Sequence, residues 1–344
     1  MPVFPPPRGD KFNFESRSSK PKLELHLPVE QMTPVVLEAS AESSGRPVLP
    51  SILRGPLWKT IALACAALLS TSRAFTDSPP SCAGRPQLCQ GATYGKPLPL
   101  PDGIRIPTYA PAPIPFHRGE QLVYRASWIG IPAATAELVL DADRNDPALL
   151  TAEVSIRTNR FTDRLYRIRD YLRESLGAES LRPATVYTRQ REGRRRDDFN
   201  VTFNPFDHIV TMVRHYPRGV QTREFLSANP AGPISGALMA LVQPLKVGDS
   251  LRFDTFISLN RYVFELNVVG RERISTPLGE FDAFRVVPSV AYVSDGKIRD
   301  QAHRTTIWVS ADARRLPLRI QSAVFIGSVR IELVKILYSA SGLE

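Results

Sequence analysis

Alternation of apolar and polar residues at a period of two is the feature that most constrains the fold of this 344-residue chain. The pattern begins near residue 116 and recurs in short segments rich in β-branched and aromatic residues, separated by polar turns. In such a segment one face is buried and the other is solvated, as in an antiparallel sheet. The first predicted strands cover residues 122–129, 134–140, 152–158, 166–176, 184–190, 199–203 and 208–214.

One segment, residues 234–242, breaks the alternation and has the alanine and leucine content of a short helix. Predicted strands then resume at residues 251–257, 262–269, 270–274, 281–288, 304–310, 316–322 and 329–337. We count about a dozen strands, within the size of a single β domain. We therefore expect an all-β, mainly antiparallel domain over residues 116–342, either a barrel or a curved-sheet sandwich with one short helix.

The chain before this domain divides by composition. Residues 1–50 have the composition of disordered chain, or they precede the true translation start. Residues 51–74 predict a secretory signal peptide, because two cations precede an uncharged apolar run and small residues offer a cleavage site after Ala74. The alternative is that this segment is not cleaved and that residues 57–72 anchor the protein in the membrane. A membrane-spanning helix needs about 20 apolar residues, and this apolar run is shorter.

The next segment, residues 75–115, is rich in proline, glycine and serine and predicts a polyproline II spacer. Cys65 lies in the apolar run and would leave with the signal peptide, although lipid modification of this cysteine is an alternative. Cys82 and Cys89 then remain as a candidate disulfide in an oxidising compartment. The chain has no CxxC, HxH or HExxH spacing, so we expect no metal and no cofactor.

The letters Gly-Asp-Ser-Leu at residues 248–251 are those that a class of lipases and esterases carries around its nucleophilic serine. Asp300 and His303 have the DxxH spacing of the other two members of that triad. In those hydrolases the serine lies near the start of the domain, between a parallel strand and a helix. Ser250 instead leads into an alternating strand late in the chain, so we interpret it as the first strand residue after a turn that Gly248 permits. An esterase stays a remote alternative.

Four segments occur in an order that resembles a family of bacterial exported proteins, domain of unknown function 3108. They are residues 124–134, 270–284, 307–317 and 326–329, and the similarity spans about residues 118 to 338. The resemblance implies a β-rich fold that is an open or closed barrel with an interior, and it implies export. The resemblance implies no catalytic residue, because none is established for the family. It also implies that residues 247–250 form a turn motif of the family.

The net charge of +10 comes mostly from arginine and suits an acidic partner. The run from Arg191 to Arg196 predicts an exposed hairpin tip that can contact lipid phosphates or acidic envelope polymers. We expect a lipid or an acidic envelope component as partner and no nucleic acid. The sequence gives no indication of the oligomeric state.

From these observations we expect a periplasmic, non-catalytic protein that holds an apolar or amphiphilic, lipid-like ligand inside its barrel, with a mature chain that does not span the membrane. The alternative is an interaction or assembly module with a filled core and a basic recognition surface. The aromatic residues expected to line the ligand cavity are Trp128, Phe253, Phe264 and Trp308.

Overall fold

The computed structural model describes residues 97–294, 297–301, 304–324 and 327–338. The predicted signal peptide, the segment before it, the Cys82 and Cys89 pair and His303 lie outside the described residues. Within the described part of the chain, no helix is long and apolar enough to cross a membrane.

Sixteen strands form one sheet and two helices accompany it in the described part of the chain. The first eight strands are β1 (Glu120–Trp128), β2 (Ile131–Ala142), β3 (Leu149–Thr158), β4 (Arg169–Gly177), β5 (Pro183–Glu192), β6 (Arg195–Phe203), β7 (Ile209–Tyr216) and β8 (Gly219–Leu226). The others are β9 (Pro230–Ala231), β10 (Ser250–Ile257), β11 (Asn260–Thr276), β12 (Gly279–Ser294), β13 (Lys297–Gln301), β14 (Thr305–Ser310), β15 (Pro317–Ala323) and β16 (Ser328–Tyr338). The helices are α2 (Arg160–Asp163) and α3 (Pro233–Leu241).

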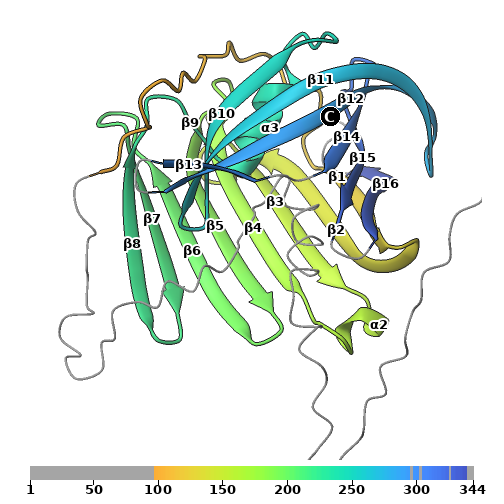
Figure 1. The fold of residues 1–344 in the computed structure, drawn as a ribbon, viewed down its shortest axis with the longest axis horizontal. Helices are drawn as coiled ribbons and strands as arrows, with labels where there is room; N and C mark the ends of the chain where they lie inside the picture. The colour runs from red at the N-terminus through yellow and green to blue at the C-terminus, as the bar shows by residue number, and fades with distance from the viewer. Residues whose placement is uncertain (1–96, 295–296, 302–303, 325–326, 339–344) are drawn as a thin grey trace, which may run out of the picture. The chain divides into compact units, whose positions relative to one another are not determined.

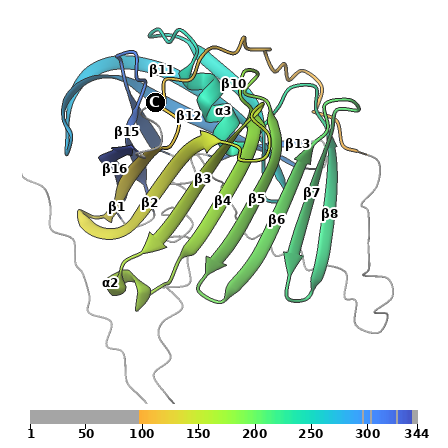
Figure 2. The same ribbon diagram turned by 180° about the vertical axis from the view of Figure 1, so that it is seen from behind.

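The pairing order brings the two ends of the domain together. Strands β1 to β8 pair with their sequence neighbours as an antiparallel meander, and β16 pairs with β1. From β16 the sheet continues through β15, β14, β12, β11 and β10 to the short β9, which pairs in parallel with β10, while β13 pairs with β12 beside this path. Figures 1 and 2 show β2 to β8 as one curved wall, with α3 at one end of it beside β10, β11 and β12.

The predicted fold class is confirmed, because the chain forms a large, mainly antiparallel sheet with α3 close to the predicted helix. The strand count of about a dozen is wrong. Residues 262–274, predicted as two strands, belong to the single strand β11, because a bulge between Val268 and Gly270 lets its pairing with β12 continue. Strand β8 was not predicted because most of its residues are partly buried and show little alternation.

A buried ion pair links β10 and β11, near one end of the sheet, to β8 at the other end. Arg261, at the start of β11, binds both carboxylate oxygens of Asp254 in β10, with Nε–Oδ1 2.8 Å and Nη2–Oδ2 2.7 Å. The same guanidinium donates to the backbone oxygens of Leu226 at 3.2 Å and Leu98 at 3.1 Å, and Ser227 Oγ donates to Asp254 at 2.5 Å. Both charges can lie in the interior because they are paired and hydrogen-bonded. They thereby connect β8 to β10, two strands that share no backbone hydrogen bonds with each other.

Residues 97–115 are the described part of the predicted spacer, and they lie against the domain. Leu98 forms a parallel bridge with Phe225. The ring of Tyr109 lies 5.0 Å from that of Phe253, and its hydroxyl accepts a hydrogen bond of 2.7 Å from the backbone N–H of Arg252. This part of the proline-rich segment therefore packs along β8 and β10 and does not hang free as a spacer would.

Most buried apolar side chains form one cluster on the inner face of the sheet, and we call it the main cluster. Strands β1 to β8, β15 and β16 contribute to it, and Ile234 and Leu238 of α3 pack into it. Smaller apolar groups lie elsewhere around α3, one with Ala240 and Phe253 and another with Leu241. Helix α3 therefore has apolar neighbours on more than one side.

Candidate functional site

A cavity of about 100 Å³ lies between α3 and strands β10, β11, β12, β14 and β15. Among the described side chains that line it, only that of Thr255 is polar. The residues in the helix and next to its two ends are Gly232, Pro233, Gly236, Ala237, Ala240, Leu241 and Leu245. The strand residues are Leu251, Phe253, Thr255, Ile257, Phe264, Leu266, Val268, Val286, Ile307, Val309, Pro317 and Ile320.

Small residues on α3 create this space. Gly236, Ala237 and Ala240 line the cavity, whereas Ile234 and Leu238 pack into the main cluster. Because residues three and four apart share a helix face, these small residues form one row whose side chains extend no further than a methyl group. The helix is thus held by its large residues on one side and leaves a space on the other.

Strand β4 caps the amino end of α3. The buried carboxylate of Glu174 accepts hydrogen bonds from the backbone N–H groups of Ile234 at 2.7 Å and Ser235 at 3.0 Å. The N-cap residue, Gly232, has no side chain that could serve this purpose, and a Cβ at this position would lie 2.2 Å from Glu174 Oε1. The glycine therefore permits the close approach, and the free N–H groups of the helix favour the carboxylate.

The environment of Glu174 makes it titrate near neutral pH. Burial raises the pKa of this carboxyl to about 7, and the hydrogen bonds from Ser235 and Ile234 oppose the shift. The charge of Glu174 is therefore linked to the placement of α3, which forms one wall of the cavity. A perturbed group beside a cavity is a common property of functional sites, although structural networks also produce it.

The structure brings two of the four predicted aromatic residues together. Phe253 and Phe264 lie opposite each other in the β10–β11 pair, and both line the cavity. Trp308 lies in β14, where its Nε1 donates to Glu272 Oε1 at 2.7 Å, and Trp128 is partly buried at the end of β1 against the main cluster. Neither tryptophan lines the cavity, and a role in ligand binding stays a prediction for all four residues.

The residues that shape the site most, Glu174 and the small residues of α3, were not among the predicted ones. The sequence carries a signal for the first, because Glu174 lies between Leu172 and Leu176 at the buried positions of an alternating strand. A carboxylate at these alternating positions faces the interior and requires a hydrogen-bond partner there. Nothing in the alternation identifies α3 as that partner.

The environment of Ser250 is that of a strand start. Gly248 has a φ of 99° in the turn that precedes β10, and Ser250 is the first residue of this strand. Its Oγ donates to Glu265 Oε1 at 2.7 Å, and Arg252 contacts the same oxygen at 3.2 Å. The bond from Ser250 and the contact with Arg252 lower the pKa of Glu265 despite partial burial, so this carboxylate is a poor general base.

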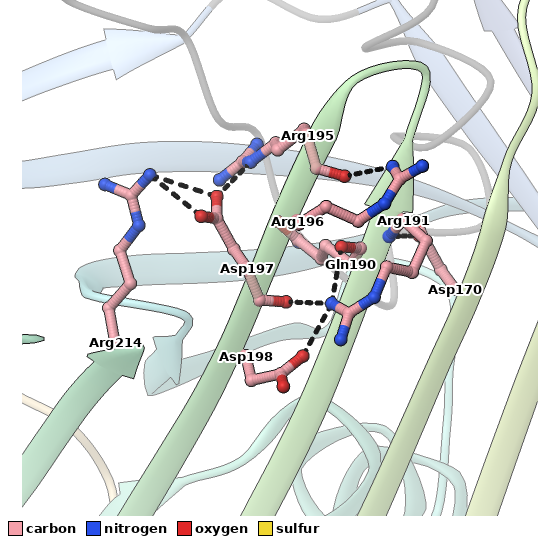
Figure 3. Close-up of polar contacts among 8 residues, drawn as sticks. All are labelled: Asp170, Gln190, Arg191, Arg195, Arg196, Asp197, Asp198 and Arg214. Atoms are coloured by element: carbon pink, nitrogen blue, oxygen red, sulfur yellow. Dashed lines mark hydrogen bonds and ion pairs between the residues drawn. The ribbon is translucent and has the colours of Figure 1, made fainter. Parts of the chain in front are cut away.

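The predicted hairpin of arginines connects β5 and β6, and two of its arginines engage carboxylates (Figure 3). Arg191 Nη1 lies 2.6 Å from Asp198 Oδ1 and 3.0 Å from the backbone oxygen of Asp197. Arg195 pairs with Asp197 Oδ2, and Arg214 of β7 binds both oxygens of Asp197 at 3.0 and 3.1 Å. Two guanidinium groups thus compensate the buried charge of Asp197.

The prediction of an exposed tip therefore holds for only part of the run. Arg194 and Arg196 are exposed, whereas Arg191 and Arg195 are partly buried. Next to them, burial and the neighbouring Glu192 raise the pKa of Asp170. Among the described residues, no group of three or more histidine, cysteine, aspartate or glutamate side chains is arranged to hold a metal ion.

The sequence profile of a family of proteins of unknown function, DUF3108, matches residues 123–334, more than half of the chain. This protein belongs to the DUF3108 family. The match begins in β1 and ends in β16, so the DUF3108 domain comprises the sheet, α3 and the cavity. No curated protein matches the sequence.

Three solved structures resemble the DUF3108 domain at low identity. One is a β-barrel-like protein with domain DUF1849 from Brucella abortus, 10% identical, covering 65% of this chain and 100% of its own, with a TM-score of 0.43. A candidate lipoprotein from Parabacteroides distasonis is 10% identical, with coverages of 67% and 100% and a TM-score of 0.33. A candidate exported protein from Bacteroides fragilis is 11% identical, with coverages of 67% and 98% and a TM-score of 0.27.

Proposed function

We propose that this protein is an exported, non-catalytic envelope protein that binds the acyl chain of a lipid-like amphiphile in the cavity beside α3. The observation that carries the proposal is the lining of this cavity, where Thr255 is the only polar side chain among the described ones. An apolar cavity stays dry and binds apolar groups, because water would find too few hydrogen-bond partners there. A hydrocarbon chain is the group that such a lining accepts best.

The size of the cavity defines which part of the ligand it takes. An engineered cavity of about 150 Å³ binds benzene, and pockets for whole small molecules have about 300 to 1,000 Å³. The cavity of about 100 Å³ beside α3 therefore takes the end of one hydrocarbon chain. The polar headgroup of the amphiphile stays outside, where it needs no buried partner.

The most informative test is native mass spectrometry of the protein as it is purified from the periplasm of its own cell. We expect a co-purifying species with the mass of a lipid or fatty acid, which solvent extraction removes. The variant Ala240→Phe, which fills the cavity with a ring, should purify without it, while Ala323→Phe at an exposed position of β15 should keep it. A folded wild-type protein without any bound amphiphile, after purification in the absence of detergent, would contradict the proposal.

A second candidate function is an interaction module, and two features favour it: the large main cluster fills the interior, and many arginines are exposed on the surface. In this case the surface carries the function and the cavity is a packing defect. The two candidates differ in the effect of Ala240→Phe, which abolishes amphiphile binding in the first and leaves partner binding unchanged in the second.

The esterase alternative needs Ser250 as nucleophile with Asp300 and His303 as its partners, and His303 lies outside the described residues. The Oγ–H of Ser250 points to Glu265, whose charged form is stabilised by Ser250 and Arg252, so this carboxylate is a poor base for activating the hydroxyl. We expect purified protein to hydrolyse short acyl esters of p-nitrophenol no faster than Ser250→Ala does. Hydrolysis that disappears in Ser250→Ala would restore the esterase and remove the non-catalytic proposal.

A further inference from the structure

Several connections at one end of the strands form a surface that we call the arginine end. It comprises the β1–β2 turn, the β3–β4 connection with α2, the β5–β6 turn and the β7–β8 turn. Figure 1 shows α2 and the tips of the β5–β6 and β7–β8 hairpins at the same lower edge of the curved wall. Hydrogen bonds join neighbouring parts: Asn159 Nδ2 donates to the Pro132 oxygen at 2.6 Å, and the Gly193 N–H donates to the Arg167 oxygen at 2.8 Å.

Unpaired cations dominate the charge of this end. Six exposed arginines have no carboxylate within 4.0 Å among the described residues: Arg160, Arg164, Arg167, Arg194, Arg196 and Arg218. Of the two carboxylates in the same connections, Asp163 pairs with Arg169 at 2.6 Å, and Glu192 is partly buried beside Asp170, a second carboxylate that does not compensate it. The arginine end therefore presents positive charge without exposed negative charge to balance it.

Large apolar side chains protrude between these arginines. Phe161 is 61% exposed and Leu165 60% exposed, and both flank Arg164 in the β3–β4 connection. Ile129 and Ile131, each 54% exposed, extend the apolar surface on the adjacent β1–β2 turn. Ile129 has a φ of 49°, a conformation that a β-branched residue adopts at a cost of about 1 to 2 kcal/mol where asparagine or glycine would fit a hairpin turn better.

The opposite end of the same strands lacks this combination. Its turns expose Asp146, Glu179 and Asp207 beside Arg144 and Arg182, so charges of both signs are mixed there. Among the described residues of this end, Phe206 in the β6–β7 turn is an exposed large apolar side chain, and Leu226 at the end of β8 is exposed to a smaller extent. The positive charge of the arginine end is thus a local property and does not follow from the net charge of the chain.

We infer that the arginine end docks on the surface of an anionic lipid bilayer. Guanidinium groups form charge-assisted hydrogen bonds with phosphates, and the exposed Phe161, Leu165, Ile129 and Ile131 can enter the boundary between headgroups and acyl chains. These side chains stand on projecting turns. A fluid bilayer can close around projections, whereas an acidic protein would need a matching hollow for each one. The inference goes beyond acyl-chain binding, because docking does not require an occupied cavity.

The test is flotation of the full-length protein with vesicles of phosphatidylcholine, with and without phosphatidylglycerol. We expect binding only to the vesicles with the anionic lipid, and weaker binding as salt rises. The triple variant R160Q/R164Q/R167Q should lower the partition coefficient about 100-fold, because each arginine near an anionic surface contributes about a factor of five. The variant F161S/L165S should lower it at least about 10-fold through lost apolar burial.

The matched control is Phe206→Ser, which removes an exposed phenylalanine from the opposite end and should leave vesicle binding unchanged. All substituted side chains are exposed, and thermal unfolding of each variant checks that the fold persists. Equal binding to both kinds of vesicle, or an equal loss in Phe206→Ser, would overturn the inference. If F161S/L165S binds anionic vesicles as the wild type does, and soluble polyglutamate competes fully, the surface recognises an acidic polymer and not a bilayer.

Vesicle flotation and amphiphile binding can fail separately. Ala240→Phe should lose the co-purifying amphiphile and still float with anionic vesicles, because the cavity is not part of the arginine end. The triple arginine variant should show the reverse pattern. Loss of both properties in either variant would contradict the separation of the two sites.

Discussion

Helix α3 contacts the sheet in two ways. Ile234 and Leu238 pack into the main cluster, whereas Gly236, Ala237 and Ala240 line the cavity. The difference shows how a β domain can keep an unfilled space without losing a defined structure. Large side chains on one face and a carboxylate at the amino end hold the helix, so its other face need not be filled.

The largest expected effect comes from a comparison of two leucines of α3, one packed in the main cluster and one beside the cavity, each replaced by alanine. Leu238→Ala removes a side chain from the main cluster and should lower the free energy of unfolding by about 3 to 5 kcal/mol. Leu241→Ala, three residues further along the same helix, should cost about 2 kcal/mol because its side chain borders the cavity as well as a smaller apolar cluster and so has fewer close contacts to lose. Urea unfolding followed by circular dichroism measures both. Equal losses of unfolding free energy would mean that Leu241 beside the cavity is packed as closely as Leu238.

A somewhat smaller effect concerns the carboxylate that holds α3. Burial raises the pKa of Glu174 from 4.5 to about 7, so between these values the folded protein binds a proton that the unfolded chain has lost. The free energy of unfolding should therefore fall as the pH rises from about 4.5 to about 7, by up to about 3 kcal/mol at roughly 1.4 kcal/mol per pKa unit. The stabilisation is complete at a pH below the pKa of Glu174 in the unfolded chain, and it is lost as the pH rises through the pKa of Glu174 in the folded protein.

Glu174→Gln removes this titration and keeps a side chain of similar shape. The difference in free energy of unfolding between wild type and variant should therefore change across the window from pH 4.5 to pH 7 and stay constant above it. Urea unfolding at several pH values provides the two curves. Parallel curves would show that Glu174 titrates at its ordinary pKa and that α3 does not perturb it.

The smallest expected effect compares two buried alanines that are enlarged in the same way. Ala152→Leu in β3 overfills the main cluster and should destabilise the protein by about 1 to 3 kcal/mol. Ala240→Leu places the same added carbons beside the cavity and should stay within about 1 kcal/mol of the wild type. If urea unfolding shows Ala240→Leu to be the more damaging of the two, the space beside α3 cannot accept hydrocarbon.

The local pattern of the sequence predicts most strands, the position of α3 and the turn before Ser250. Each depends on residues that are neighbours in the chain, and β11 shows the limit, because the bulge at Val268 and Gly270 interrupts the alternation within a continuous strand. Strand β8 was missed for a related reason, since partial burial on both faces leaves little contrast.

The contacts that define the interior join residues far apart in the sequence. Glu174 meets Ile234 across 60 positions, and Arg261 meets Leu98 across 163. The alternation marks Glu174 as facing inward but cannot name its partner, because the partner depends on where the sheet curves. The cavity depends in the same way on packing, so Phe253 and Phe264 were placed beside it from their aromatic character while Trp128 and Trp308 lie elsewhere.

The most direct test of acyl-chain binding is photo-crosslinking with a fatty acid that carries a diazirine at the end of its chain. If the chain end enters the cavity, irradiation should label peptides that contain Ala237, Ala240, Phe253 or Leu266, and unlabelled fatty acid should compete. Ala240→Phe should abolish this labelling. Labels confined to the outer surface, or labels in the cavity peptides that persist in Ala240→Phe, would contradict the proposal that this protein holds a hydrocarbon chain beside α3.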